Sequence, residues 1–355
     1  MNTNGRIIGL DMLRGLAVML MVFGHCVSWG DYGAVFAPYQ SLGWALTGVR
    51  MPVLVLVSGT LAHGLLRADA AKLRARLAHF GWTYAVWMPV VLLFTMTCLT
   101  PAAMHAPVRI GADTVIAEFV RPMTVMWFVW VLAIYTTLLF ATRRLPRAGV
   151  AAAAMLVSVI GYAIDLSIFS HGNLLRYAAL FFVGALYRAE VMRLVTARFS
   201  WAVMAALVAG LVPLHMVGQA VRAAEGWQVL GMPERFVLCA IALHGVQLLY
   251  RLPVAAPIAR LGQRTLPVFV AHLPILLLAR MVLPDLGHAG GVVAPVVLAT
   301  VSIAGSLLLE RIAIGLGADW LYARPAWAGT ATLRHVTDRL SDQVALVARW
   351  ARPVA

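Results

Sequence analysis

Residues 10–29 read LDMLRGLAVMLMVFGHCVSW, an apolar stretch long enough to cross the hydrocarbon core of a bilayer as one helix. The stretch lacks the small-residue cleavage site of a signal peptide, and more apolar segments follow it, so we expect it to remain as the first membrane span. Three ionisable residues interrupt it, namely Asp11, Arg14 and His25. Because charges inside a span are costly, such residues are usually functional and face the interior of a helix bundle.

The whole chain shares this apolar character. Of its 355 residues, 62% are hydrophobic and 12% are charged, whereas an average soluble domain is about half apolar and about a quarter charged. This composition excludes a soluble globular enzyme, a disordered protein and a fibrous repeat. Because backbone groups in lipid must be satisfied internally, and no alternating ten-residue strands are found, we predict an all-α polytopic membrane protein.

About ten transmembrane helices fit this length, at roughly 30 residues for each span and its loop. We place them at residues 10–29, 42–66, 79–100, 124–141, 148–164, 173–187, 200–218, 231–250, 261–283 and 292–317. The membrane domain then occupies residues 1–320, and residues 321–355 form a cytoplasmic tail.

Apolar residues recur at helical spacing in this tail. They are Leu333, Val336, Leu340, Val344 and Val347. The pattern predicts an amphipathic helix that lies on the cytoplasmic leaflet, and a loosely ordered tail is the alternative.

Basic residues are divided unequally between the two sets of loops. If the N-terminus is cytoplasmic, 18 of the 28 Lys and Arg residues fall on inner segments and only 3, Arg109, Arg121 and Arg222, fall on outer loops. Because cytoplasmic loops carry the excess of Lys and Arg, this asymmetry predicts that both termini are cytoplasmic. It also accounts for the formal net charge of +14, so we expect no nucleic-acid partner.

The spacing of Arg14 and His25 puts both side chains on one face of the first helix. Eleven residues at about 100° each return to within about 20° of the starting direction and rise about 16 Å. Arg14 then lies near the cytoplasm, one turn from Asp11, which can hold it in an ion pair. His25 lies in the outer half of the membrane, and a packing histidine that hydrogen-bonds a neighbouring helix is the alternative.

Residues 10–17, LDMLRGLA, followed by Gly24-His25, resemble the opening of the acyltransferase-3 family of integral membrane acyltransferases, whose signature is an arginine, ten residues and a histidine. Further segments resemble the family in the same order: Met51-Pro52 through Ser58-Gly59, Trp127-Phe128, Phe181-Phe182-Val183-Gly184, Leu261-Gly262 with Val268-Phe269-Val270-Ala271-His272, and Leu309-Glu310-Arg311. The chain departs from the family at Phe269, where tyrosine is usual, at Ile312, where proline is frequent, and in the spacing of Lys72, Arg74 and Arg76.

The resemblance implies transfer of an acyl group, commonly acetyl, from cytoplasmic acyl-CoA to a hydroxyl of a glycan, lipid-linked or other cell-envelope acceptor. It implies acetyl-CoA as co-substrate without a bound cofactor, and a multi-pass protein of the cell inner membrane. His25 suits the chemistry because histidine titrates near neutral pH and can take the proton of a hydroxyl that attacks a thioester. His25 can alternatively accept the acyl group and relay it.

Other candidate residues divide between the two substrates. For the acyl donor, Arg14 can pair with a CoA phosphate or a pantetheine carbonyl, and Arg74 and Arg76 can bind CoA phosphates at the inner face. For the acceptor, the candidates are Arg50, Ser58, Trp127, His272 and Glu310. His272 is expected near the depth of His25, where it can orient the acceptor or tune His25.

Each candidate also has a structural explanation. The alternatives are a buried Arg14–Glu310 ion pair, a helix contact for His272, snorkelling of Arg50 to the headgroups, a membrane anchor at Trp127 and topology determinants at Arg74 and Arg76. The scattered cysteines Cys26, Cys98 and Cys239 indicate neither a disulfide framework nor a metal site.

Two other functions compete with acyl transfer. A proton-coupled transporter or channel can use Arg14, His25, His272 and Glu310 as a relay, but the two halves of the chain show no inverted repeat. A non-catalytic scaffold of the cell envelope leaves the spacing of Arg14 and His25 unexplained.

The distribution of basic residues can be tested with reporter fusions. A reporter joined after Arg324 should face the cytoplasm, and one inserted beside Arg109 should face outward, because 18 basic residues lie on inner segments and 3 on outer loops. Finding both reporters on the same side of the membrane would contradict the predicted topology.

Overall fold

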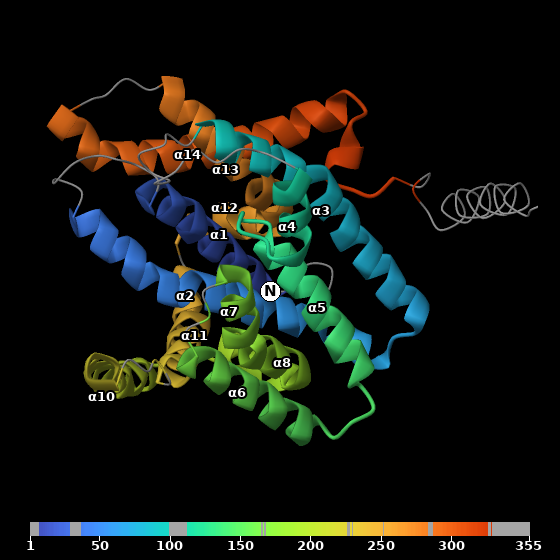
Figure 1. Cartoon of the computed structure of the whole chain (residues 1–355). Coiled ribbons are helices and arrows are strands. Elements are labelled where there is room, and N and C mark those ends of the chain that lie inside the picture. Colours follow the sequence, from blue (N-terminus) through green and yellow to red (C-terminus); the bar gives the residue numbers. More distant parts are fainter. Residues whose placement is uncertain are drawn as a thin grey trace, which may run out of the picture.

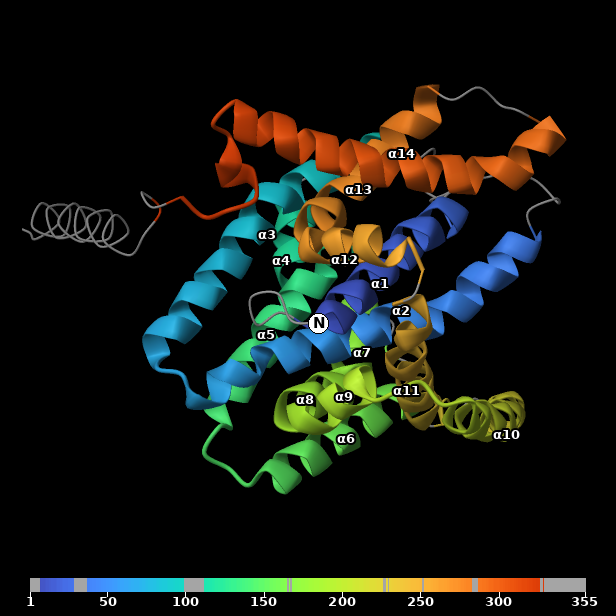
Figure 2. The same ribbon diagram turned by 180° about the vertical axis from the view of Figure 1, so that it is seen from behind.

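The computed structural model is all-helical wherever it describes the chain (Figure 1, Figure 2). The structure describes residues 7–28, 37–98, 112–164, 166, 168–225, 228, 230–250, 252–282, 287–325 and 328, with the side chains of 37–45, 112 and 287–292 excepted. Within these ranges no β-strand is found, which confirms the predicted fold class. The predicted tail helix and the outer loop that carries Arg109 lie outside the described residues.

Fourteen α-helices and two 3-10 helices make up the described chain. They are α1 (Ile8–Ser28), α2 (Ala37–Ala62), η2 (His63–Arg67), α3 (Ala70–Cys98), α4 (Ala112–Val120), α5 (Trp127–Ala141), α6 (Arg147–Ala163), α7 (Phe169–Arg176), α8 (Ala178–Leu186), α9 (Arg188–Thr196), α10 (Trp201–Glu225), α11 (Gly231–Leu249), α12 (Ala255–Gln263), α13 (Thr265–Val282), α14 (Gly287–Gly315) and η3 (Asp319–Leu321).

Seven of the described helices are long and apolar enough to cross a membrane, so the chain is a multi-pass membrane protein. They lie in α1, α2, α3, α10, α11, α13 and α14. Helices α5 and α6 are shorter but also apolar. Ten spans with both termini cytoplasmic remain a prediction, because nothing in the structure fixes the count or the orientation.

The sixth predicted span, residues 173–187, is not one helix. It is divided at Tyr177 into the end of α7 and the whole of α8. Ser158 of α6 supports the break, because its Oγ accepts a hydrogen bond of 2.8 Å from the backbone N–H of Ala179 and donates one of 3.1 Å to the carbonyl of Leu175. A side chain that satisfies freed backbone groups makes an interrupted helix tolerable in lipid.

Helix α1 lies at the centre of the bundle, and α10 lies at its edge. In both views α1 is enclosed by α2, α12, α13 and α14, whereas α10 stands aside and packs on α11 (Figure 1, Figure 2). Most apolar side chains of α10 are exposed, and Trp201 and Met216 are two examples. A helix that exposes apolar residues in this way has lipid as its natural surroundings.

Glycines allow helix backbones to touch at two places. A Cβ on Gly15 of α1 would lie 2.2 Å from the carbonyl oxygen of Ile258, and a Cβ on Gly262 of α12 would lie 1.6 Å from that of Asp11. In the same way, a Cβ on Gly59 of α2 would lie 2.0 Å from the Phe181 oxygen of α8. Small residues at such contacts are the usual means of close helix packing in membranes.

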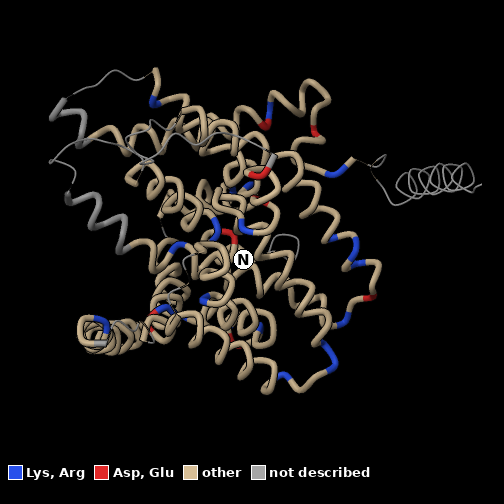
Figure 3. The backbone as a smooth tube through the Cα atoms, in the orientation of Figure 1, with Lys and Arg blue, Asp and Glu red and all other residues tan. Residues whose placement is uncertain are grey.

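Basic residues gather at one corner of the bundle. The turn between α2 and α3 and the turn between α5 and α6 lie side by side, and both carry Lys or Arg (Figure 3). Both turns belong to the predicted inner segments. Their proximity is what a shared cytoplasmic face requires.

The glycine contacts predict a loss of stability on adding one methyl group. Gly59→Ala and Gly184→Ala should each lower the free energy of unfolding by about 1–3 kcal/mol or more, because the new Cβ meets backbone atoms that cannot rotate away. Gly210→Ala in α10 is the matched control, since nothing lies within 4 Å of its Cβ position. That control should be neutral or stabilising by up to about 1 kcal/mol. Thermal unfolding of the purified variants in detergent measures all three.

Candidate functional site

A cavity of about 750 Å³ opens beside the C-terminal end of α1, and we call it the large cavity. Its lining combines polar and aromatic side chains: His25, Arg50, Thr124, Trp127, Tyr162, Asn173, Arg176, Tyr177, Gln228, Arg235 and Phe269 are among them. Its size falls within the range of about 300–1,000 Å³ that is usual for small-molecule sites. His25 is therefore accessible from the cavity rather than enclosed by apolar packing.

His25 and His272 form the central contact of the site. The Nδ1 atom of His25 lies 2.9 Å from Nε2 of His272. The ring centroids are 5.1 Å apart and the ring planes differ by 13°, which is the geometry of an in-plane N–H···N hydrogen bond. His272 is fully buried and does not line the cavity, so of its two predicted roles the contact favours action through His25.

The hydrogen bonds of His272 determine which ring nitrogens carry protons. Its Nδ1 lies 3.0 Å from the carbonyl oxygen of Val268 and 2.8 Å from that of Phe269, and carbonyls only accept hydrogen bonds. In the neutral pair Nδ1 of His272 is thus the protonated nitrogen, and its Nε2 accepts the hydrogen bond. His25 then carries its proton on Nδ1, which leaves Nε2 as its basic nitrogen.

Arg50 reaches into the same cavity from α2. Its side chain is 8% exposed, Nη1 donates a long hydrogen bond of 3.4 Å to the carbonyl of Leu20, and Nε is buried without a hydrogen-bond partner in the described part of the chain. The guanidinium lies against Gly24, where a Cβ would come within 1.2 Å of Nη1. The snorkelling alternative is wrong, because Arg50 points into the protein instead of toward headgroups.

Trp127 is a wall of the cavity and not a surface residue. It is 7% exposed, and its ring lies 6.1 Å from that of Tyr177 at 23° and 5.7 Å from that of Phe169 at 81°. A membrane anchor would be exposed to the headgroup region. The anchor alternative is therefore wrong, and Trp127 adjoins the space in which a ligand would lie.

Two arginines that sequence reasoning did not select complete the large cavity. Arg176 and Arg235 lie over the ring of Tyr162, with Cζ at 6.0 Å and 5.4 Å from its centroid. In the sequence they are single arginines within predicted spans, and no motif marks them. Only the packing of α6, α7 and α11 shows that they share a cavity with His25.

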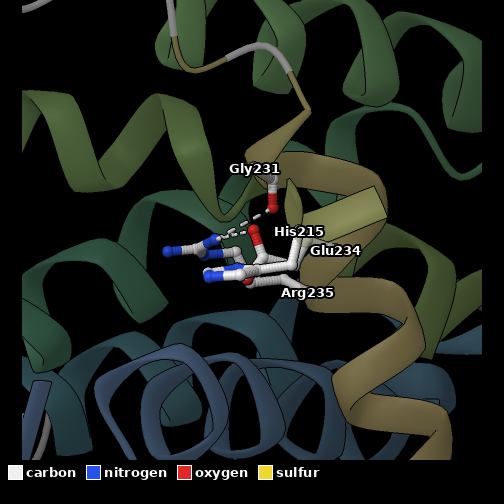
Figure 4. Close-up of polar contacts among 4 residues, drawn as sticks. All are labelled: His215, Gly231, Glu234 and Arg235. Atoms are coloured by element: carbon white, nitrogen blue, oxygen red, sulfur yellow. Dashed lines mark hydrogen bonds and ion pairs between the residues drawn. The ribbon is translucent and has the colours of Figure 1, made fainter. Parts of the chain in front are cut away.

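Arg235 is positioned by its own helix and by α10. Its Nη1 donates to the carbonyl of Gly231 at 3.2 Å and lies 3.5 Å from Oε2 of Glu234, whose Oε1 is 3.0 Å from Nδ1 of His215 (Figure 4). Arg176 is held separately, because its Nε donates to the carbonyl of Gly161 at 3.0 Å. Both guanidinium groups are thereby fixed at the wall of the cavity.

A second, smaller cavity of about 210 Å³ lies beside the N-terminal half of α1. Its polar lining consists of Arg14, Ser58, His79, Thr83 and Thr265. Arg14 Nη2 donates to Oγ1 of Thr265 at 2.7 Å, and Nη1 lies 3.8 Å from Asp11, as the spacing of these two residues predicted. Arg14 and His25 therefore face different cavities along one helix.

Glu310 reaches the junction of α12 and α13. Its Oε2 lies 3.2 Å from Nη2 of Arg264. Arg264 directly precedes Thr265, whose hydroxyl accepts the hydrogen bond of Arg14. Burial and the Glu310 carboxylate raise the pKa of Tyr322, beyond α14, to about 12. The sequence pointed to Arg14 as the partner of Glu310, and Arg264 was not selected.

Arg74 and Arg76 line neither cavity. Arg74 is exposed on α3. The guanidinium of Arg76 lies 5.7 Å from the ring centroid of Phe80, and Phe80 lines the small cavity. Of the two, Arg76 is the closer to that cavity.

Phe269 separates the two cavities and lines both of them. Its ring lies 5.5 Å from that of Phe128, which lines the small cavity, while the preceding residue, Trp127, lines the large one. The family tyrosine that Phe269 replaces would add a hydroxyl at this partition. Here the partition is a contact between two apolar rings.

Glu118 supports one edge of the large cavity. This buried carboxylate of α4 accepts hydrogen bonds from the backbone N–H groups of Met123 and Thr124, at 2.9 and 3.4 Å, and from Oγ1 of Thr124 at 3.1 Å. Tyr84 of α3 donates to the Glu118 carbonyl. Because Met123 and Thr124 line the cavity, Glu118 determines where that edge lies.

Comparison with known proteins gives one finding. A family model described as an acyltransferase domain, that of acyltransferase family 3, matches residues 7–311 of the chain. The matched region includes both cavities and the histidine pair. No curated protein and no solved structure matches the chain significantly.

The contacts of Glu118 predict an effect on stability. Glu118→Gln should lower the free energy of unfolding by about 1–3 kcal/mol. Both carboxylate oxygens accept hydrogen bonds here, and the amide would put an NH2 group, itself a donor, in the place of one of them. Glu190→Gln is the matched control, since the Glu190 side chain is exposed on α9, and it should stay within about 0.5 kcal/mol of the parent protein. Equal thermal transitions for the two variants would contradict the role given to Glu118.

Proposed function

The chain belongs to the acyltransferase-3 family and is a membrane acyltransferase, and we propose that it transfers an acyl group, most simply acetyl, from cytoplasmic acyl-CoA to a hydroxyl of a glycan or another cell-envelope acceptor. The proposed setting is the cell inner membrane, with the acceptor in the large cavity. The observation that carries the proposal is the hydrogen-bonded pair of His25 and His272 at the wall of that cavity.

The tautomer of the pair supports general-base catalysis by His25. His272 accepts a hydrogen bond from Nδ1–H of His25. In this tautomer Nε2 of His25 carries no proton and can act as a base. This is the logic of a catalytic histidine whose second nitrogen is held by a buried partner. His272 is accordingly a positioning residue in the proposed mechanism.

The reaction balances with His25 as the only proton carrier. The acceptor oxygen attacks the carbonyl carbon of the thioester while its proton passes to Nε2 of His25. The C–S bond then breaks, and the CoA sulfur leaves with the proton returned by the imidazolium. An ester of the acceptor, free CoA and a neutral His25 remain, so the cycle needs no further reactant.

The small cavity is the proposed site of the pantetheine arm of acyl-CoA, which carries the acyl group. A volume of about 210 Å³ suits a narrow pantetheine arm better than a whole coenzyme, so the nucleotide would stay outside, near Arg76. Arg14 and Ser58 offer polar contacts along the arm. The thioester would meet the acceptor at Phe269, where the two cavities adjoin.

An acyl-histidine relay and a proton-coupled transporter remain as alternatives that make different predictions. A relay would leave a labelled acyl group on the protein when acetyl-CoA is supplied without acceptor. A transporter would move a solute and leave acetyl-CoA intact. Membership of an acyltransferase family favours acyl transfer over transport.

Replacement of His25 tests the proposed chemistry. His25→Gln should lower acyl transfer by about 100-fold or more, because an amide can hydrogen-bond His272 but has no useful basicity. The assay follows labelled acetyl-CoA with purified protein in lipid nanodiscs. Thermal unfolding should change little, since glutamine keeps a donor and an acceptor at this position.

The matched control is His244→Gln, because His244 is also buried and its Nε2 accepts a hydrogen bond from the backbone of Ser200, away from both cavities. This variant should transfer acyl groups at close to the parent rate per folded molecule. A folded His25→Gln protein with undiminished transfer would remove the proposed role of His25.

A further inference from the structure

The large cavity concentrates positive charge. Three arginines, Arg50, Arg176 and Arg235, line it, and no aspartate or glutamate is among the described residues of its wall. The hydroxyl of Tyr177 lies within electrostatic reach of all three. All three guanidinium groups line the same cavity, so a ligand bound there would experience their charge.

Arg50 is the arginine whose environment calls most clearly for an anion. Its side chain is 8% exposed, its Nε has no hydrogen-bond partner among the described residues, and the contact of its Nη1 with the Leu20 carbonyl is a long one of 3.4 Å. A buried cation without an anionic partner is costly. Because the side chain lines a cavity, a ligand can supply the missing anion.

Arg176 and Arg235 add charge beside Tyr162. Both contact the ring of Tyr162, and backbone carbonyls fix their orientation. Glu234 lies 3.5 Å from Arg235 and offsets part of its charge, but Glu234 also contacts His215 and does not line the cavity. Together with Arg50 they place three guanidinium groups on the described wall of the cavity.

We propose that the acceptor carries an anionic group, a carboxylate or a phosphate, beside the hydroxyl that is acylated. This inference rests on the proposed function and adds the class of acceptor. A guanidinium presents a planar fork that binds carboxylate and phosphate through two hydrogen bonds. Arg50 binds the anion of the acceptor, while Asn173, Tyr177 and Trp127 contact its uncharged part.

The acyl donor is the other anionic ligand to consider, because CoA carries phosphates. The small cavity with Arg14 lies on the other side of Phe269, and Arg76 adjoins it. The donor therefore has cations of its own, apart from Arg50, Arg176 and Arg235. Separate measurement of the two KM values distinguishes the ligands.

The experiment compares acceptors that share a methyl glucoside framework and differ in one charged group. Methyl β-glucuronide, methyl β-glucoside and methyl β-glucoside 6-phosphate are offered with labelled acetyl-CoA to the purified protein in nanodiscs. We expect kcat/KM for the better of the two anionic probes to exceed that of the neutral probe by about tenfold or more. The glucuronide and the phosphate arms then tell which anion the cavity prefers.

Variants assign the preference to Arg50. Arg50→Gln should raise the KM of the anionic acceptor by about tenfold or more and leave the KM of acetyl-CoA unchanged. Arg50→Lys should retain part of the preference, because it keeps the charge but loses the fork. Gly24→Ala should act like Arg50→Gln, since its Cβ would occupy the place of the guanidinium. Arg222→Gln, on exposed α10, is the control and should change nothing.

Binding to the His25→Gln protein separates this inference from the proposed function. Thermal stabilisation by the charged probes but not by the neutral one supports an anionic acceptor, even where the parent protein acetylates none of the three. Equal binding and turnover of neutral and charged probes would overturn the inference. A rise in the KM of acetyl-CoA alone in Arg50→Gln would also overturn it and assign the three arginines to the donor.

Discussion

Backbone contact between α1 and α12 at Gly15 and Gly262 sets the positions of the residues that follow on α1 and, beyond the turn at Arg264, on α13. With no side chain between them, the two chains have almost no freedom to slide or separate. His25 and His272 each follow their glycine by ten residues. A hydrogen bond between two imidazoles tolerates only small displacements, so this contact is a condition for the histidine pair. The second contact, between Gly59 and α8, likewise holds α2 and with it Arg50 beside Tyr177.

Much of the fold follows from the sequence because apolar length and basic loops are properties of single segments. The first span and the depth shared by His25 and His272 follow from apolar length and helix geometry, and the structure agrees with both. The interruption at Tyr177 was not predicted. Its stability depends on Ser158 of another helix, and no signal within residues 173–187 reports that partner.

Candidate residues were harder to assign to an environment than to recognise. Arg50 and Trp127 were both selected, but composition could not tell a residue that faces lipid from one that faces a cavity, because both environments adjoin an apolar helix. Arg176 and Arg235 were not selected, since they matter only together with Arg50. A cluster of charges from three helices is a property of packing, and a single sequence carries no record of which helices meet.

The apolar contact between Phe128 and Phe269 has a consequence for the membrane itself. Polar cavities lie on either side of it along the length of α1, and a continuous file of water through both would conduct ions. Hydrophobic constrictions exclude water and so interrupt such a file. An uncharged acyl group can slip past two phenyl rings, whereas a hydrated ion cannot shed its water there. If the acyl donor and the acceptor reach the protein from opposite faces of the bilayer, as proposed, acyl transfer can proceed without dissipating the electrochemical gradient.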